Sequence, residues 1–138
     1  MPRNMAEQRL QFVVVRDLRW LLPSDAVLLM IPNGGDMTEA ARKKAAGLGE
    51  YPGASDLLVV WGGKALFIEL KVRASAEWNI PQTTYQKPPQ KEFQAAIERA
   101  GAHYEVCRSV DEALAFLRAH SIPLREKQVI NKGVGRAP

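Results

Sequence analysis

Hydrophobic positions along the chain follow two kinds of period, and together they predict an alternation of helices and strands. Apolar residues at helical spacing predict helices over residues 5–22, 38–48, 89–100 and 110–120. Short apolar runs predict strands over residues 26–31, 57–61, 65–70 and 103–108. The order α-β-α-β-β-α-β-α predicts an α/β fold in which helices flank a mixed β-sheet.

The second and third predicted strands flank Gly62-Gly63, which is typical of a β-hairpin with a tight turn. If these glycines occupy the turn centre, Asp56 lies opposite Glu69, with Cβ atoms ~5 Å apart. Side chains alternate between the faces of a strand, so Glu69 and Lys71 share one face. The hairpin therefore gathers two carboxylates and an ammonium at its open end.

Two facing carboxylates need a reason, because like charges opposite each other destabilise a sheet. At ~5 Å and an effective dielectric of about 20 they repel by roughly 3 kcal/mol. A divalent cation between them would offset this repulsion, and oxygen ligands suit Mg²⁺ or Mn²⁺. Lys71 could then pair with charge developing on a phosphate or with a metal-bound water. The alternative is that these charges are solvated at an exposed hairpin end, where a register slipped by one residue separates them and no metal site forms.

Composition narrows the class of protein without identifying it. The 138 residues suit a single domain, which we expect over residues 1–120, followed by a basic, flexible tail over 121–138. A net charge of +4 is compatible with a polyanionic partner. Cys107, the one cysteine, lies in an apolar run and predicts a core thiol in a reducing compartment. The histidines lack zinc-site spacing, and neither a signal peptide nor a membrane span is visible. We expect a cytoplasmic protein.

Other polar residues have both a functional and a structural interpretation. Glu7 lies on the inward stripe of the first helix, either as a partner of the helix dipole or as a site residue. Gln90, in the first turn of a later helix, either reaches a site or faces solvent. The loop over residues 72–88 either tracks a nucleic acid strand or is disordered. The basic residues of helix 38–48 and of this loop either contact a nucleic acid backbone or are solvated; they are Arg42, Lys43, Lys44, Arg73 and Lys87.

Taken in order, these residues and several glycine-containing motifs form one pattern over roughly residues 5–120. The pattern consists of Glu7, Asn33-Gly34-Gly35, Gly47-x-Gly49, Pro52-Gly53-x-x-Asp56, Glu69-x-Lys71, Gln90, Gly101-x-x-Tyr104-x-Val106-Cys107 and Glu112-Ala113. The chain resembles in this respect the VRR-NUC (virus-type replication-repair nuclease) domains of the PD-(D/E)xK nuclease superfamily. It departs from the family pattern at Ser55, where a proline is expected before the acid, and in the length of loop 72–88.

The resemblance implies a restriction-endonuclease-like fold and a Mg²⁺- or Mn²⁺-dependent DNA endonuclease. It implies a homodimer without an organic cofactor, encoded by a bacterium or a phage, that acts on branched DNA such as Holliday junctions in replication or repair. It assigns the metal to Asp56, Glu69, the Leu70 backbone carbonyl and Glu7, further catalytic roles to Lys71 and Gln90, and DNA contacts to Asn33 and the basic residues named above. Two alternatives remain. One is a noncatalytic DNA-binding or assembly module. The other is a metal-dependent hydrolase of small phosphate esters, although the sequence lacks the glycine-rich phosphate-binding loop that often precedes a helix in such proteins.

Overall fold

The computed structural model describes residues 3–32, 38–77 and 85–125, and the side chains from residue 5 onward. Its elements follow the predicted order. They are α1 (Arg3–Leu21), β1 (Val27–Met30), α2 (Glu39–Gly47), β2 (Leu57–Trp61), β3 (Lys64–Leu70), α3 (Pro88–Arg99), β4 (His103–Cys107) and α4 (Val110–Ala119). The predicted turn at Asn33 lies outside the described residues.

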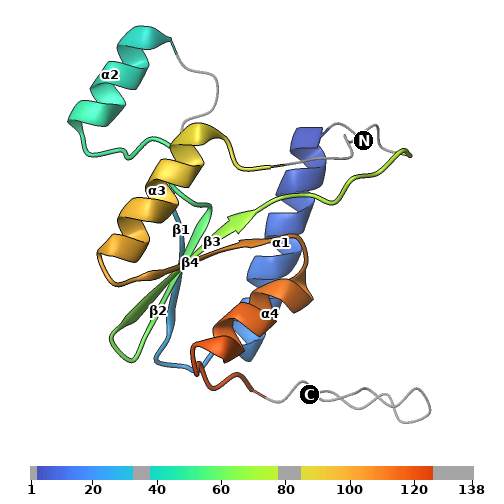
Figure 1. The fold of residues 1–138 in the computed structure, drawn as a ribbon. Coiled ribbons are helices and arrows are strands. Elements are labelled where there is room, and N and C mark those ends of the chain that lie inside the picture. Colours follow the sequence, from blue (N-terminus) through green and yellow to red (C-terminus); the bar gives the residue numbers. More distant parts are fainter. Residues whose placement is uncertain (1–2, 33–37, 78–84, 126–138) are drawn as a thin grey trace.

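The strands form one mixed sheet in the order β1-β2-β3-β4. β2 pairs antiparallel with β1 on one side and with β3 on the other. β4 runs parallel to β3, and the chain reaches it through α3 (Figure 1). In the hairpin, Trp61 pairs with Lys64 and Leu57 with Ile68. This is the register that the Gly-Gly turn predicted, because a two-residue turn leaves no freedom for the strands to slide.

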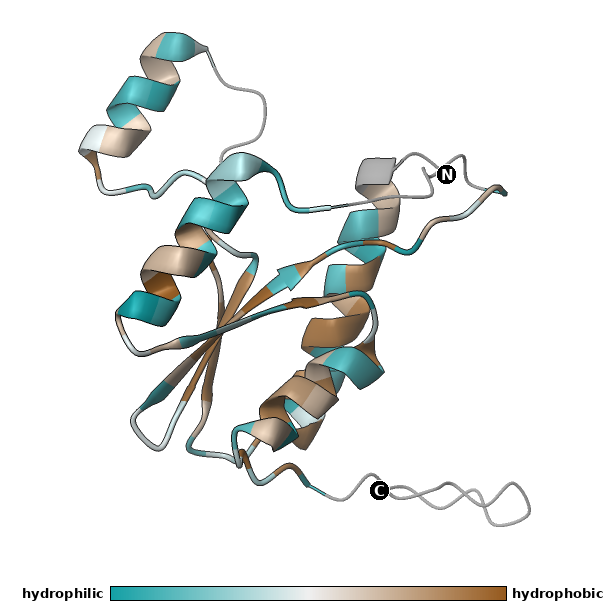
Figure 2. Cartoon of the chain, viewed as in Figure 1, coloured by the Kyte–Doolittle hydropathy of each residue, from teal (hydrophilic) through white to brown (hydrophobic). Residues whose placement is uncertain are grey.

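Helices cover the two faces of the sheet unequally. α1 and α4 lie together against one face, and α3 lies on the other (Figure 1). The larger core joins the predicted stripes of α1 and α4 to the inward residues of β2 and β3. The most hydrophobic stretches accordingly coincide with the strands and the adjoining parts of these two helices (Figure 2). A smaller cluster of Ala54, Phe93 and Tyr104 lies under α3.

Two elements have little protection from solvent. β1 is an edge strand, and its Val27 and Met30 are largely exposed. None of the residues of α2, all of which the structure describes, is buried. α2 therefore derives little of its stability from packing, although the Thr38 hydroxyl caps it by accepting a hydrogen bond from the Ala41 N–H at 3.1 Å.

Part of the segment expected to be a flexible tail packs on the domain. Ile122 is buried in the larger core, and the Arg125 N–H donates to the Leu21 carbonyl at 2.7 Å. The packed chain therefore reaches at least Arg125, and residues 126–138 lie outside the described part. Among the helices of the described residues, none combines the length and hydrophobicity needed to cross a bilayer.

Candidate active site

Asp56 continues the β2–β3 pairing one residue beyond the hairpin strands. Its N–H donates to the Ile68 carbonyl at 3.1 Å, and its carboxylate accepts from the Leu70 N–H at 2.7 Å. Together with the observed register, these bonds put Asp56 opposite Glu69. The alternative, a register slipped by one residue, is wrong, since Leu57 pairs with Ile68 and Trp61 with Lys64.

The other two charged groups of the hairpin end are buried rather than solvated. The side chains of Glu69 and Lys71 are 5% and 6% exposed, and the Lys71 Nζ lies 3.8 Å from the Glu69 Oε2. Glu69 Oε1 is the buried side-chain polar atom that lacks a hydrogen-bond partner among the described residues. A buried carboxylate oxygen without a donor is costly, so a cation, or a proton shared with Asp56, would stabilise it at this place.

Gln90 reaches this cluster from the first turn of α3. Its Oε1 accepts from the Lys87 N–H at 2.8 Å and so satisfies a backbone donor at the start of α3. Its Nε2 donates to the Glu69 Oε2 at 3.2 Å. The helix cap therefore fixes the amide in the orientation in which it contacts Glu69, and Gln90 is not simply a solvent-facing residue.

The electrostatics of the cluster favour an added positive charge. Burial, followed by repulsion from Asp56, raises the pKa of Glu69 to about 8, although the Lys71 ammonium acts in the opposite direction. Burial also raises the pKa of Asp56, while the bond from the Leu70 N–H opposes the rise. The charge of Glu7 raises both pKa values, so α1 brings this third carboxylate within electrostatic range.

The chemistry of these groups fits a hard divalent cation. Within the described part of the chain, no three His, Cys, Asp or Glu side chains converge closely enough to hold a metal ion by themselves. Mg²⁺ does not require such a cage, because one or two carboxylates bind it together with waters and substrate phosphates. Asp56 and Glu69, with the unpartnered Oε1, meet that requirement. The carbonyl of Leu70 and the carboxylate of Glu7 remain predicted ligands.

The predicted DNA-binding residues lie on different parts of the molecule. Arg42, Lys43 and Lys44 are exposed on α2, which stands off from the sheet beyond α3 (Figure 1). Arg73 is exposed and forms an ion pair with Glu112 at 2.9 Å. Lys87 is the exposed N-cap residue of α3, next to Gln90. Asn33 lies outside the described residues.

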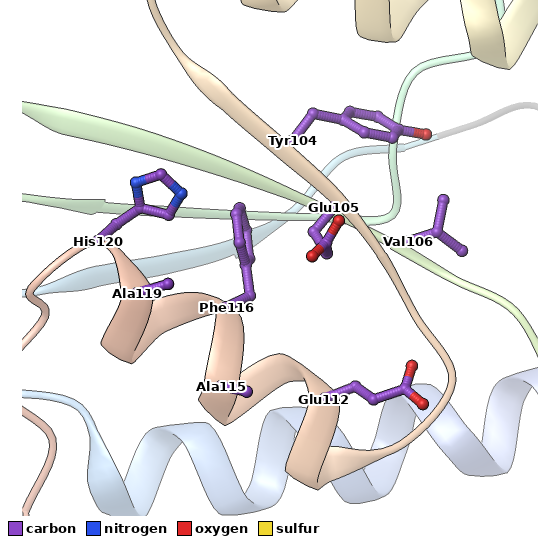
Figure 3. Close-up of a pocket in the computed structure, with 8 residues that line it drawn as sticks. All are labelled: Tyr104, Glu105, Val106, Glu112, Ala115, Phe116, Ala119 and His120. Atoms are coloured by element: carbon purple, nitrogen blue, oxygen red, sulfur yellow. The ribbon is translucent and has the colours of Figure 1, made fainter.

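A surface pocket of about 440 Å³ lies elsewhere, between β4 and α4. Glu112 and Phe116 line it from α4, His120 from the C-cap of that helix, and Glu105 from β4 (Figure 3). None of the predicted site residues lines it. Two carboxylates in the lining disfavour a phosphate ligand, so the candidate active site is the hairpin end and not this pocket.

Two contacts around the cluster were not anticipated from the sequence. The Gln86 Nε2 donates to the Tyr104 hydroxyl at 3.2 Å and to Gln94 at 2.9 Å, which ties the chain before α3 to β4. Gly53 lies against the backbone of Pro89 and Gln90. The Pro52-Gly53 pair signals a turn, but a sequence pattern does not show what a turn packs against.

Comparison with known proteins identifies a shared fold. A solved structure named "VRR_NUC domain protein" superposes with a TM-score of 0.63 at 21% sequence identity, covering 86% of this chain and 89% of that chain. No protein-family model and no curated protein matches the sequence. The likeness spans nearly the whole domain, so the mixed sheet with its flanking helices is a VRR-NUC-like fold.

Proposed function

We propose that the chain, whose VRR-NUC-like fold buries Glu69 and Lys71 and holds a half-buried Asp56 opposite Glu69, is a nuclease that hydrolyses phosphodiester bonds in DNA with Mg²⁺ or Mn²⁺. We infer that its substrate is branched DNA, such as a four-way junction, and that it acts in replication or repair. We expect it to assemble as a homodimer. The observation that carries the proposal is the buried Glu69, whose Oε1 lacks a partner among the described residues while Asp56 lies opposite it.

The roles of the residues follow from their contacts. Asp56 and Glu69 would hold the cation, which supplies Lewis-acid stabilisation of the phosphate and a water of lowered pKa. The Gln90 amide and the Leu70 N–H each fix one carboxylate by a hydrogen bond, which keeps the donor oxygens in place.

Lys71 supplies the fixed positive charge of the site. Its ammonium is buried beside Glu69, where low dielectric strengthens its interaction with negative charge. An ammonium held in this way can stabilise the negative charge that develops on the phosphate as its bond to the leaving oxygen breaks. Glu7, from α1, is the further carboxylate that would complete the cation's surroundings.

The test is cleavage of four-way junctions, flaps, single strands and plasmid with Mg²⁺, with Mn²⁺ or with EDTA. We expect cleavage that depends on the cation in the parent protein, and its loss in Asp56→Asn and Lys71→Ala. Asp111→Asn is the matched control, because Asp111 is an exposed carboxylate in the first turn of α4. Light scattering in the same buffers measures the oligomeric state.

Each result of this experiment has a clear meaning. Cleavage of junctions in preference to single strands supports the branched-DNA substrate, and equal cleavage of all substrates supports nuclease activity without structural preference. Full activity in either site variant would contradict the assigned roles. DNA binding without cleavage, combined with no Mn²⁺ binding by calorimetry, would show that the chain is a noncatalytic module.

A further inference from the structure

The turn before β2 makes an unusually close backbone contact with α3. Gly53 has a φ of +78°, and a Cβ atom at this position would lie 2.7 Å from the Gln90 nitrogen and against the carbonyl group of Pro89. Both neighbouring groups are backbone, so a larger residue could not be accommodated by a side-chain rotation. The turn and the helix can therefore touch only because residue 53 has no side chain.

The same turn holds α3 at a second point. The Ala54 N–H donates to the Tyr51 carbonyl at 3.1 Å, which closes the turn. The Tyr51 ring meets the Phe93 ring edge-on, with centroids 5.2 Å apart. Phe93 is buried one turn further along α3 than Pro89, so the turn contacts two successive turns of the helix.

This contact joins the two halves of the candidate active site. On one side, the chain runs from Gly53 through buried Ser55 to Asp56. On the other side, the contacted first turn of α3 carries Gln90, whose amide donates to Glu69. A displacement of this helix turn by even about 1 Å would stretch that 3.2 Å bond beyond hydrogen-bonding distance.

We propose that Gly53 is a positioning residue: its contact with Pro89 and Gln90 sets the Gln90 amide on Glu69 and thereby orients a metal-binding carboxylate. The orientation of Gln90 can be measured without metal or substrate. The consequence for metal affinity rests on the proposed function, so the two parts are tested separately.

Other glycines of the chain provide matched controls. Gly49 precedes the same turn with a φ of +103°, and Gly63 has a φ of +75°. At both positions, no described atom outside the immediate neighbours lies within 4 Å of the place that a Cβ atom would occupy. Alanine at Gly49, Gly53 or Gly63 carries a similar backbone cost, but Gly53→Ala alone among the three collides with α3.

The first measurement is NMR of the metal-free protein, in which the Gln90 side-chain amide is assigned through Gln90→Ala. We expect Gly53→Ala to shift this amide signal and to speed its hydrogen exchange, while Gly49→Ala and Gly63→Ala leave it in place. Tyr51→Ala removes the second contact without a collision and should move the same signal less. If Gly53→Ala does not fold, the Tyr51→Ala result decides, with Tyr85→Ala as the exposed aromatic control.

The second measurement is Mn²⁺ affinity by calorimetry. Loss of a group that orients a ligand weakens metal binding by roughly 10- to 100-fold, and we expect that loss in Gly53→Ala and in Gln90→Ala. Because both substitutions break one contact, the double variant should bind about as tightly as the weaker single variant. Losses that multiply, or a parent-like Mn²⁺ affinity in Gly53→Ala, would overturn the link from Gly53 to the metal.

The NMR and calorimetric measurements test the positioning role of Gly53 and the proposed metal site separately. An unmoved Gln90 amide in a folded Gly53→Ala, or in Tyr51→Ala if Gly53→Ala does not fold, would overturn the positioning role whatever the protein binds. A moved amide in a parent protein that binds no Mn²⁺ would support the positioning contact and contradict the proposed metal site.

Discussion

The Asp56 carboxylate accepts a hydrogen bond from the backbone N–H of Leu70 at 2.7 Å. Such a bond stabilises the charged form of a carboxyl, and it opposes the burial that raises the Asp56 pKa. The Glu69 carboxyl instead contacts side chains: the Gln90 amide, the Lys71 ammonium and the carboxyl of Asp56 itself. The two acids therefore differ in what opposes the effect of burial: the Leu70 N–H for Asp56, and the Lys71 ammonium for Glu69, whose pKa is raised to about 8.

The pKa of Glu69 predicts how stability depends on pH without metal. The ordinary pKa is 4.5 and the folded value is about 8, so the folded chain binds more protons between these values. The free energy of unfolding should therefore fall by a few kcal/mol as the pH rises through this window, and level off above it. Urea unfolding with EDTA measures this. Glu69→Gln should flatten the fall, whereas Glu77→Gln, at an exposed glutamate, should retain it.

Metal binding should have the opposite dependence on pH. A cation must displace the proton of Glu69, so the apparent Mn²⁺ affinity should rise as the pH approaches about 8 and change little above it. Calorimetry in buffers of different ionisation enthalpy counts the protons released. An affinity that does not change across this range would show that Glu69 is not a ligand.

Lys71 should affect catalysis more than metal binding. Lys71→Met keeps the aliphatic length and removes the charge that lies 3.8 Å from Glu69. We expect the cleavage rate to fall about 100- to 1,000-fold, as for loss of a group that stabilises developing charge. Mn²⁺ affinity should not fall in parallel, because the ammonium repels the cation. A variant that loses both equally would make Lys71 a structural support of the site.

The basic residues of α2 should contribute to DNA affinity through phosphates alone. Lys43→Gln and Lys44→Gln should weaken binding to all sequences equally, and each should lower the slope of log affinity against log salt by about 0.9. Fluorescence anisotropy over a salt series provides the slopes. Arg118→Gln, at an exposed cation of α4 outside the predicted set, should leave the slope unchanged.

Stability should depend on the hairpin core and not on the exposed leucine that ends α2. Leu57 is 0% exposed and Leu48 is 79% exposed. Leu57→Ala removes buried methyl groups and should cost about 2–5 kcal/mol, whereas Leu48→Ala should change the free energy of unfolding by less than about 0.5 kcal/mol. Urea unfolding of both variants in one buffer makes the comparison.

Local patterns explain why so much of the fold could be predicted. The Gly62-Gly63 turn fixes the hairpin register within a few residues, and that register puts Asp56 opposite Glu69. The stripe on α1 and the capping of α4 by Ser109, whose hydroxyl accepts from the Glu112 N–H at 3.1 Å, are equally local. Period and turn chemistry act over a few residues, so they can be recognised without knowing the fold.

What the sequence did not reveal depends on contacts between distant segments. The approach of Gly53 to Pro89 arises only when α3 packs over the sheet, and the burial of Lys71 likewise appears only in the folded domain. The packing of Ile122 beyond the expected domain end likewise depends on a core assembled from α1 and α4. Hydrophobic period indicates which face of an element is buried, but it does not indicate its partner.

The crossover from β3 through α3 to β4 determines when in folding the candidate site becomes complete. The β2–β3 hairpin joins residues that are close in sequence, so we expect it to form before the parallel β3–β4 pairing, which must first close a long loop. A chain that has made only the hairpin carries Asp56 and Glu69 but lacks the amide of Gln90. A newly synthesised chain should therefore hold the Glu69 carboxylate in a fixed orientation only after β4 has docked.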